Sequence, residues 1–289
     1  MTRPPIDLSA HINRTVERGH PADFPVVLKP VFVSNGDGYD AVPHRRAVVR
    51  EDTGTPISVL SDRYSLVPHQ RILQIVEQAI VPLDVGPVPR GIFVDREGAR
   101  MRALFKFPSL AKPVVRLDDI CPCLKIQNTY DGTSRISIHI GAFRFVCTNL
   151  AVGGGGVFAG GFMSVHAGEI PIEEVAAQLA SYLLGFEAIV ALYRAWTETF
   201  LDEAGLAEIL ESFPKRSREA IEKKVAERMA TTVYDAYNLA TWYATHEMRS
   251  YRTAFNLLAL VNRSFQERFP ASLEGSKSLP AADLRALPA

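Results

Sequence analysis

The stretch Arg135-Ile136-Ser137-Ile138-His139-Ile140 decides the fold, because isoleucine occupies every second position between polar residues. A period of two places the isoleucines on one face of a β-strand and the polar side chains on the other. Leu124-Lys125-Ile126-Gln127 precedes this strand, and residues 128–134 between the two are typical of a turn. We therefore predict an antiparallel hairpin whose second strand is buried on one face.

Two more hairpins are predicted upstream. The first joins Ala47–Arg50 to Ile57–Leu60 around a turn that contains Gly54. The second joins Ile92–Val94 to a return strand over Ala99–Phe107. In this return strand, three of the four positions that alternate with the inward-facing residues are basic: Arg100, Arg102 and Lys106.

Helices are predicted over about residues 70–80 and again throughout the C-terminal part of the chain. After Asn149 a glycine-rich connector leads into helical periodicity, which continues from about residue 171 to Phe269. Pro214 interrupts this periodicity, as does the segment Met248–Tyr251. The resulting helices are expected over residues 172–200, 216–229 and 232–269, the last in two pieces.

The order of the elements, strands first and helices last, indicates an α+β fold. We expect an antiparallel sheet built from hairpins in the N-terminal half, with the helical C-terminal half packed on it. Residues 1–24 are expected to form a flexible arm and residues 271–289 a disordered tail. Residues 25–165 form the predicted β-rich region with one helix, and residues 166–270 the helical region of the same domain.

The chain carries no motif that predicts catalysis or a cofactor. It lacks GxSxG, HExxH and CxxC, and the glycine run over residues 153–161 is not followed by the Gly-Lys-Ser/Thr of a phosphate loop. Three cysteines and His139 could surround a metal, but their spacing does not suit zinc. Buried reduced thiols are the simpler interpretation of Cys121, Cys123 and Cys147. We therefore expect no catalytic residues, no metal and no cofactor.

Location is inferred from the absence of targeting signals. The N-terminus has no apolar core of the kind that signal peptides contain, and polar residues interrupt every long apolar run. We therefore expect a cytoplasmic protein that does not associate with a membrane.

Basic residues are concentrated in the middle of the chain. The whole chain has 32 basic and 32 acidic residues, whereas residues 90–150 hold 10 basic and 5 acidic ones. If the basic side chains share the open face of the sheet, they form a groove that neutralises phosphates, and nearby aromatic rings can stack on unpaired bases. The predicted nucleic-acid-binding residues are Arg100, Arg102, Lys106, Lys125, Tyr130, Arg135 and Arg144. In the alternative interpretation, the aromatic rings belong to the core and the cations solvate an ordinary sheet.

Three stretches together resemble a known family. They are Ser61–His69, the turn at residues 128–133 followed by Arg144–Asn149, and Tyr234–Thr241 with His246. In their order they are similar to the phage/plasmid-like family called domain of unknown function 932. The residues that carry the resemblance are Tyr64, His69, Asn128, Asp131, Gly132, Arg144, Cys147, Asn149, Asn238, Thr241 and His246. The resemblance implies residence on plasmids and prophages, and an association with DNA recombination. Structural roles in turns and strand ends explain the same residues without a ligand.

Three functions follow as hypotheses. The first is a non-enzymatic protein that binds single-stranded DNA on the basic sheet face and acts as an oligomer in annealing. The second is an interaction factor that binds a phage, plasmid or host protein through its C-terminal helices, anchored by aromatic residues. Those residues are Tyr234, Tyr237, Trp242 and Tyr243. The third is a metal-dependent nuclease with ligands from distant positions.

Overall fold

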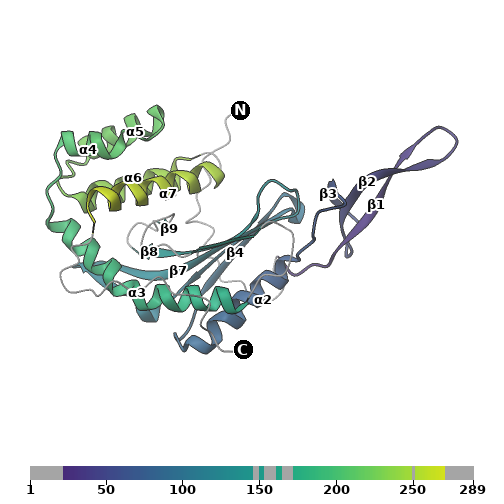
Figure 1. Ribbon diagram of the computed structural model, residues 1–289, viewed down its shortest axis with the longest axis horizontal. Helices are drawn as coiled ribbons and strands as arrows, with labels where there is room; N and C mark the ends of the chain where they lie inside the picture. The colour runs from purple at the N-terminus through teal and green to yellow at the C-terminus, as the bar shows by residue number, and fades with distance from the viewer. Residues whose placement is uncertain (1–21, 146–149, 153–160, 165–171, 249–250, 271–289) are drawn as a thin grey trace.

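The computed structural model describes residues 22–145, 150–152, 161–164, 172–248 and 251–270. Antiparallel strands fill the N-terminal half of this part of the chain and helices fill the C-terminal half (Figure 1). The α+β prediction is therefore confirmed. The expected N-terminal arm, with the exception of its last residues, and the expected C-terminal tail lie outside the described residues.

A small sheet projects from the body of the molecule (Figure 1). Its strands pair in the order β1 (Val26–Ser34), β2 (Tyr39–Arg50) and β3 (Pro56–Ser61). Pro30 does not end β1, because β1 is an edge strand and its register shifts between Pro30 and Phe32. β3 pairs only with the base of β2, from Arg45 to Val49. The outer part of the β1–β2 hairpin is consequently a two-stranded ribbon.

The large sheet contains the two other predicted hairpins. Its strands pair in the order β10-β8-β7-β5-β4, with β6 beside β7 and β9 beside β8. In the central pair, Leu124 lies opposite Ile140 and Ile126 opposite Ile138, so the isoleucines share one face, as predicted. The prediction that this second strand is buried on one face only is wrong, because Ser137 and His139 on the other face are 9% and 7% exposed. The bounds are β4 (Arg90–Asp95), β5 (Arg100–Lys106), β6 (Lys112–Val115), β7 (Asp118–Thr129), β8 (Ile136–Arg144), β9 (Leu150–Val152) and β10 (Gly161–Ser164).

The helices begin and end close to the predicted positions, except the one over Glu203–Leu210, which was not predicted as a separate helix. They are α2 (His69–Ile80), α3 (Ile172–Glu198), α4 (Glu203–Leu210), α5 (Lys215–Glu227), α6 (Val233–His246) and α7 (Tyr251–Arg268), with short 3-10 turns at Val81–Leu83, Arg96–Gly98 and Pro108–Leu110. Pro214 directly precedes α5, where its missing N–H costs no helical hydrogen bond. Thr232 caps α6 by accepting a hydrogen bond from the backbone N–H of Asp235 at 3.1 Å.

The large sheet has two faces with different partners. Its core face, represented by Met101, Ile126 and Ile138, belongs to one apolar cluster that also includes residues of α2, α3, α6 and α7. A separate small cluster on the second face contains Leu104, Cys121, Cys123 and Phe143. Both described cysteines are buried free thiols, as the sequence predicts.

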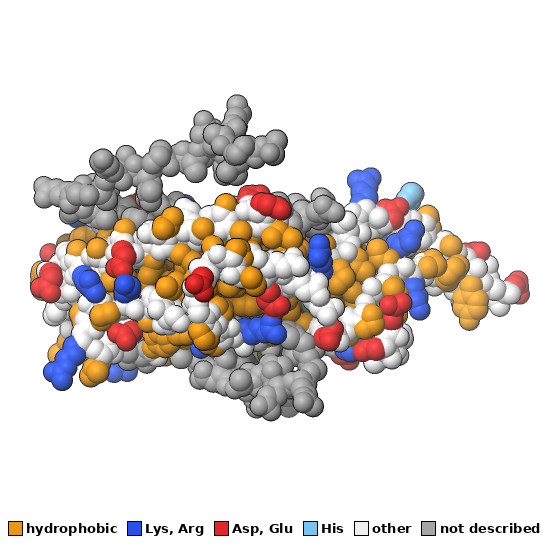
Figure 2. Space-filling model, turned by 90° about the horizontal axis from the view of Figure 1, so that it is seen from below, with side chains coloured by type: hydrophobic (Ala, Val, Ile, Leu, Met, Phe, Trp, Pro, Cys, Tyr) orange, Lys and Arg blue, Asp and Glu red, His pale blue; other side chains and the backbone are white. Residues whose placement is uncertain are grey.

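Helix α3 joins the sheet to the other helices. The hydroxyl of Tyr193 on α3 lies 2.8 Å from that of Tyr237 on α6, which donates to Asn262 of α7 at 2.6 Å. Among the described helices, only α3 is long and apolar enough to span a membrane, a test that a buried core helix also passes. Seen from below, the α3 side of the molecule presents many apolar side chains (Figure 2). Of the α3 residues, Leu184 is 81% exposed.

Gly98 is a backbone position that a side chain would disrupt, with φ at +101°. A Cβ at Gly98 would lie 2.5 Å from Cζ of Phe24, whereas one at Gly36, where φ is +97°, would meet nothing within 4 Å. We expect Gly36→Ala to lower the free energy of unfolding by about 1 kcal/mol through backbone strain. Gly98→Ala should cost about 2 kcal/mol more because of the added clash. Urea denaturation measures both variants, and equal losses would contradict the role of the Phe24 contact.

Candidate functional site

The basic residues predicted to form one groove lie on both faces of the large sheet. Strand alternation places Arg102 and Lys106 on the second face, where Lys125 lies opposite Leu104 and His139. Arg144 lies opposite Ile120, and it is an even number of residues from the inward-facing isoleucines of β8, so its side chain is on the same face as theirs. It therefore lies on the core face, so the predicted convergence with the other cations does not occur.

Two cations of the second face are already engaged by carboxylates. Arg100 Nε donates to Oδ2 of Asp131 at 2.7 Å, and Arg102 Nη2 donates to Oδ2 of Asp95 at 2.8 Å. The Arg102 guanidinium also lies 4.6 Å from the ring centroid of Phe93. Only 11% of the Arg102 side chain is exposed, so little of its charge is accessible to a phosphate.

The central part of the second face is buried. Lys125 is 5% exposed and His139 7% exposed. Burial lowers the pKa of Lys125 to about 7, and burial together with the nearby Lys125 lowers the pKa of His139 to about 4. Lys106 lies over the Phe143 ring at 4.9 Å, which leaves Arg135 as the exposed member of the predicted set. This face does not form the open cationic groove that was expected.

The buried His139 predicts a loss of stability in acid. Its pKa is about 4 in the folded chain against an ordinary 6.5, so between these values only the unfolded chain binds the proton. The stabilisation is complete above pH 6.5 and is lost as the pH falls toward 4. In the wild type, the free energy of unfolding should fall by roughly 3 kcal/mol between pH 6.5 and pH 4 because of this residue, and we expect His139→Gln to abolish that part of the fall. Denaturant titrations across this pH range measure it. The exposed His44→Gln is the control, and an unchanged pH dependence in His139→Gln would refute the assignment.

The motif residues of the N-terminal half form a buried network. His69 stacks on Tyr130 with ring centroids 3.9 Å apart, and its backbone N–H donates to the Tyr130 hydroxyl at 2.6 Å. His69 Nε2 lies 2.9 Å from the carbonyl of Gly98, which can only accept. Nδ1 is then the acceptor for the Asn128 amide at 2.9 Å. Tyr130 is 0% exposed, so it is not available as the stacking platform predicted from its place in the turn.

Neighbouring motif residues shape the turn between β7 and β8. The Tyr64 hydroxyl donates to the carbonyl of Thr129 at 3.0 Å. Asp131 accepts a hydrogen bond from the backbone N–H of Thr133 at 3.1 Å, and Gly132 follows with φ at +68°. These contacts favour the structural interpretation, in which the motif fixes the start of α2 to this turn.

Asn128 provides a test of that interpretation. Its amide donates to the carbonyl of Val67 at 3.0 Å as well as to His69. Asn128→Ala leaves both acceptors buried without this donor, and we expect it to lower the free energy of unfolding by about 1–3 kcal/mol. Gln127→Ala, which removes a half-buried amide bonded to Ser134, is the control and should cost less. A neutral Asn128→Ala in thermal denaturation would contradict the network's structural role.

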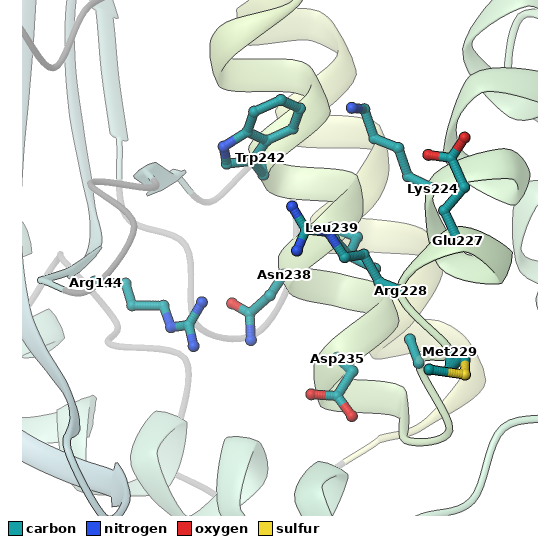
Figure 3. Close-up of a pocket in the computed structure, with 10 residues that line it drawn as sticks. Arg144, Lys224, Glu227, Arg228, Met229, Asp235, Asn238, Leu239 and Trp242 are labelled. Atoms are coloured by element: carbon teal, nitrogen blue, oxygen red, sulfur yellow. The ribbon is translucent and has the colours of Figure 1, made fainter.

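A pocket of about 510 Å³ lies between the end of β8 and helices α5 and α6 (Figure 3). Its walls combine cations, two carboxylates, an amide, an indole and apolar side chains. The lining residues are Arg144, Lys224, Glu227, Arg228, Met229, Ala230, Asp235, Asn238, Leu239 and Trp242. The pocket therefore brings together Arg144 and Asn238, which come from two different motifs of the family resemblance.

A hydrogen-bonded chain fixes the β8 side of the pocket to α6. Nε and Nη2 of Arg144 each donate to a carboxylate oxygen of Asp118 at 2.6 Å. The Tyr234 hydroxyl donates to the same carboxylate at 3.1 Å. Burial, together with the charge of Asp118, raises the pKa of Tyr234, which also hydrogen-bonds the Asn238 side chain. The Arg144 guanidinium and the Asn238 amide are thus held facing one another (Figure 3).

The helix side of the pocket presents cations and a ring. Lys224 Nζ lies 4.1 Å from the ring centroid of Trp242 and 3.7 Å from Oε1 of Glu247. Arg228 is exposed and forms no ion pair with the described residues. The pocket carboxylates have partners nearby, since Glu227 pairs with Lys223 at 3.7 Å and Asp235 accepts from the Thr232 hydroxyl at 2.8 Å. Such a wall suits an anion joined to a flat ring.

The other predicted functional residues are either buried or half-buried, or they lie outside the described residues. Tyr234, Tyr237 and Tyr243 are 3%, 1% and 6% exposed and belong to the core, so they do not form the expected surface anchor. Thr241 is buried and donates to the carbonyl of Asn238 at 3.0 Å, and the His246 ring lies 5.2 Å from Trp242. Cys147 and Asn149 lie outside the described residues. Among the described residues, no group of three or more His, Cys, Asp or Glu side chains is placed to hold a metal.

Sequence reasoning missed the contribution of α5 to the pocket. Lys224 and Arg228 come from a helix in which only Ser217 and Ile221 are buried. A strongly polar helix that follows a proline was a usable signal, because such a helix packs by a narrow stripe and leaves its cations at the surface. The sequence could not show that this surface faces Arg144.

The comparisons with known proteins identify one family and no characterised relative. A family model described as "Domain of unknown function (DUF932)" matches residues 56–277. No curated protein and no solved structure matches the chain. The matched range contains every described residue that lines the pocket, but not the outer part of the β1–β2 hairpin.

Proposed function

We propose that this chain, which belongs to the DUF932 family, binds single-stranded nucleic acid without chemical conversion in the pocket between β8, α5 and α6. The match over residues 56–277 confirms the family resemblance seen in the sequence. The family's description names no activity, so the proposal rests on the geometry of the pocket. One observation carries it: three cationic side chains and a partly exposed indole converge on one pocket.

Arg228 supplies most of the affinity for phosphate, because Arg144 is already paired with Asp118 and Lys224 lies 3.7 Å from Oε1 of Glu247. Arg144, Lys224 and Arg228 line the pocket together with two carboxylates. Glu227 is paired with Lys223 at 3.7 Å, and Asp235 is hydrogen-bonded to the Thr232 hydroxyl but keeps its charge. Arg228 has no carboxylate partner in the described chain. A guanidinium without such a partner binds a phosphate with charge-assisted hydrogen bonds. An oligonucleotide would therefore be attracted to the α5 side of the pocket.

Trp242 supplies the preference for a single strand. Bases stack on aromatic rings only when they are not already paired and stacked in a duplex. The Lys224 ammonium now covers the indole at 4.1 Å, and a stacked base would replace it. The displaced ammonium then lies close to the phosphate of the same nucleotide. The Asn238 amide, with one donor and one acceptor group, is placed to contact a base edge.

The proposed binding site is therefore the pocket and not the basic sheet face that the sequence suggested, but the proposed ligand, a single strand, is the same. The resemblance to phage and plasmid proteins leads us to propose DNA as the natural strand, handled during recombination of a mobile element in the cytoplasm. Neither alternative gains a specific observation: the tyrosines of the interaction surface are buried, and a nuclease would need ligands beyond those of the described chain.

Fluorescence anisotropy with a labelled oligothymidylate tests the proposal. We expect the logarithm of the affinity to fall with the logarithm of the salt concentration. Arg228→Ala should make this slope shallower by about 0.7, the value for one phosphate contact on a single strand. Trp242→Ala should weaken binding by about 1–3 kcal/mol, because one stacked base is lost.

Two control variants locate the site. Arg216→Ala removes an exposed guanidinium from the other end of α5, and Arg135→Ala removes the exposed cation of the sheet. Neither change should alter the salt slope. Binding that is absent at low salt would refute the proposed function. Binding that depends on Arg135 but not on Arg228 and Trp242 would place the site on the sheet instead.

A further inference from the structure

The outer part of the β1–β2 hairpin is exposed without a partner in the described chain. Its apolar side chains face solvent: Phe32 is 55% exposed, Val33 57% and Tyr39 77%. They lie in the part of the hairpin that has no third strand. Isolated two-stranded ribbons are marginally stable in water, and exposed apolar patches commonly mark interaction sites. We call residues 32–40 the hairpin tip.

The hairpin tip has a defined shape. Asn35 Oδ1 accepts hydrogen bonds from the backbone N–H groups of Asp37 at 3.2 Å and Gly38 at 2.7 Å. The Asn35 amide donates to Oδ2 of Asp40 at 2.9 Å. Tyr39 pairs with Ser34 at the end of the ribbon. A turn held in this way presents the exposed Tyr39 with little conformational freedom to lose on binding.

We propose that the hairpin tip of one copy docks into the β8–α5–α6 pocket of a second copy. Asp37 and Asp40 are the only charged residues between residues 30 and 43, so the tip is acidic. The pocket offers Arg144 on its β8 side, Lys224 and Arg228 on its helix side, and Met229, Leu239 and Trp242 for an aromatic ring. It also contains Glu227 and Asp235, so the attraction depends on Arg228, which has no carboxylate partner among the described residues. The charge and the apolar surface of the two sites are complementary.

Other exposed apolar surfaces suit the tip less well. The outer side of α3 exposes Leu184, but Glu173 and Glu174 are exposed on the same helix. These carboxylates would repel Asp37 and Asp40. Two hairpin tips would repel one another for the same reason. Charge therefore selects the pocket among these surfaces.

The arrangement of the fold makes the contact intermolecular. In Figure 1 the hairpin projects from one end of the molecule, and α5 lies at the other end. A tip cannot reach its own pocket without unfolding, so each copy would offer a tip to one neighbour and a pocket to another. Such a head-to-tail contact is heterologous and generates rings or open chains. It would also exclude an oligonucleotide from an occupied pocket, although the docking itself does not depend on the proposed function.

Sedimentation velocity of the full chain at increasing concentration tests self-association. We expect the wild-type protein to associate, and added salt to weaken the association because the contact is charged. Tyr39→Ala should raise the dissociation constant by about tenfold or more, as expected for loss of a central aromatic anchor. Val59→Ala, which changes a 52% exposed side chain on β3 outside the tip, is the matched control and should have no effect.

Complementary charge variants test the head-to-tail geometry. The tip variant carries Asp37→Asn, Tyr39→Ala and Asp40→Asn and keeps its pocket, whereas the pocket variant carries Lys224→Glu and Arg228→Glu and keeps its tip. Each should be monomeric alone, and their mixture should form dimers and nothing larger, because only one productive contact remains. Circular dichroism confirms that each variant is folded.

Three results would overturn the inference: a monomeric wild type at all concentrations, variants that associate as well as the wild type, or a mixture that stays monomeric. Co-purification of another protein that protects the tip from proteolysis, with a monomeric wild type, would assign the tip to a different partner. The tip variant separates this inference from the proposed function. It should still bind oligothymidylate, so failure of one idea leaves the other measurable.

Discussion

The antiparallel pairing of β7 with β8 is the constraint on which the rest of the structure depends. Its register places Ile126 opposite Ile138 and Leu124 opposite Ile140, and this row forms the floor on which the helices pack. Because side chains alternate between the two faces, the same register also determines on which face of the sheet each polar residue of both strands lies. A slip of one residue would place Lys125 and His139 in the main core and move the isoleucines out of it.

The ends of this strand pair carry the contacts that connect the sheet to the rest of the chain. At one end, Asn128 and Tyr130 hold His69 at the start of α2. At the other end, Asp118 and Arg144 form a two-bond ion pair that Tyr234 joins from α6. A buried ion pair contributes little net stability, but it strongly disfavours arrangements that leave one charge alone. These contacts fix where α2 and α6 lie, and the second one builds a wall of the pocket.

The pocket and the hairpin tip are related by their chemistry. Phosphate oxygens and the carboxylates of Asp37 and Asp40 are both anions, and a nucleobase and the Tyr39 ring are both flat. A pocket that binds a phosphate and a nucleobase therefore also has the features needed to bind a carboxylate and the Tyr39 ring. Self-association would then compete with nucleic-acid binding for Arg228 and Trp242. The concentration of the protein itself would control access to its pocket.

The sequence by itself determined most elements and which side chains of each strand face the core, because periodicity is a local property that each segment carries alone. It did not show that Lys125 and His139 on the other face are buried as well. The period of two predicted the hairpins, Pro214 predicted the start of α5, and the family motifs marked Arg144 and Asn238. The alternation of side chains along β8 also places Arg144 on the same face as the isoleucines, opposite the face that carries Arg102. Only the tertiary structure decided which charges are neutralised and which meet: Asp118 reaches Tyr234 across 116 positions of sequence. That pairing depends on how the helices pack on the sheet, and no local pattern encodes it.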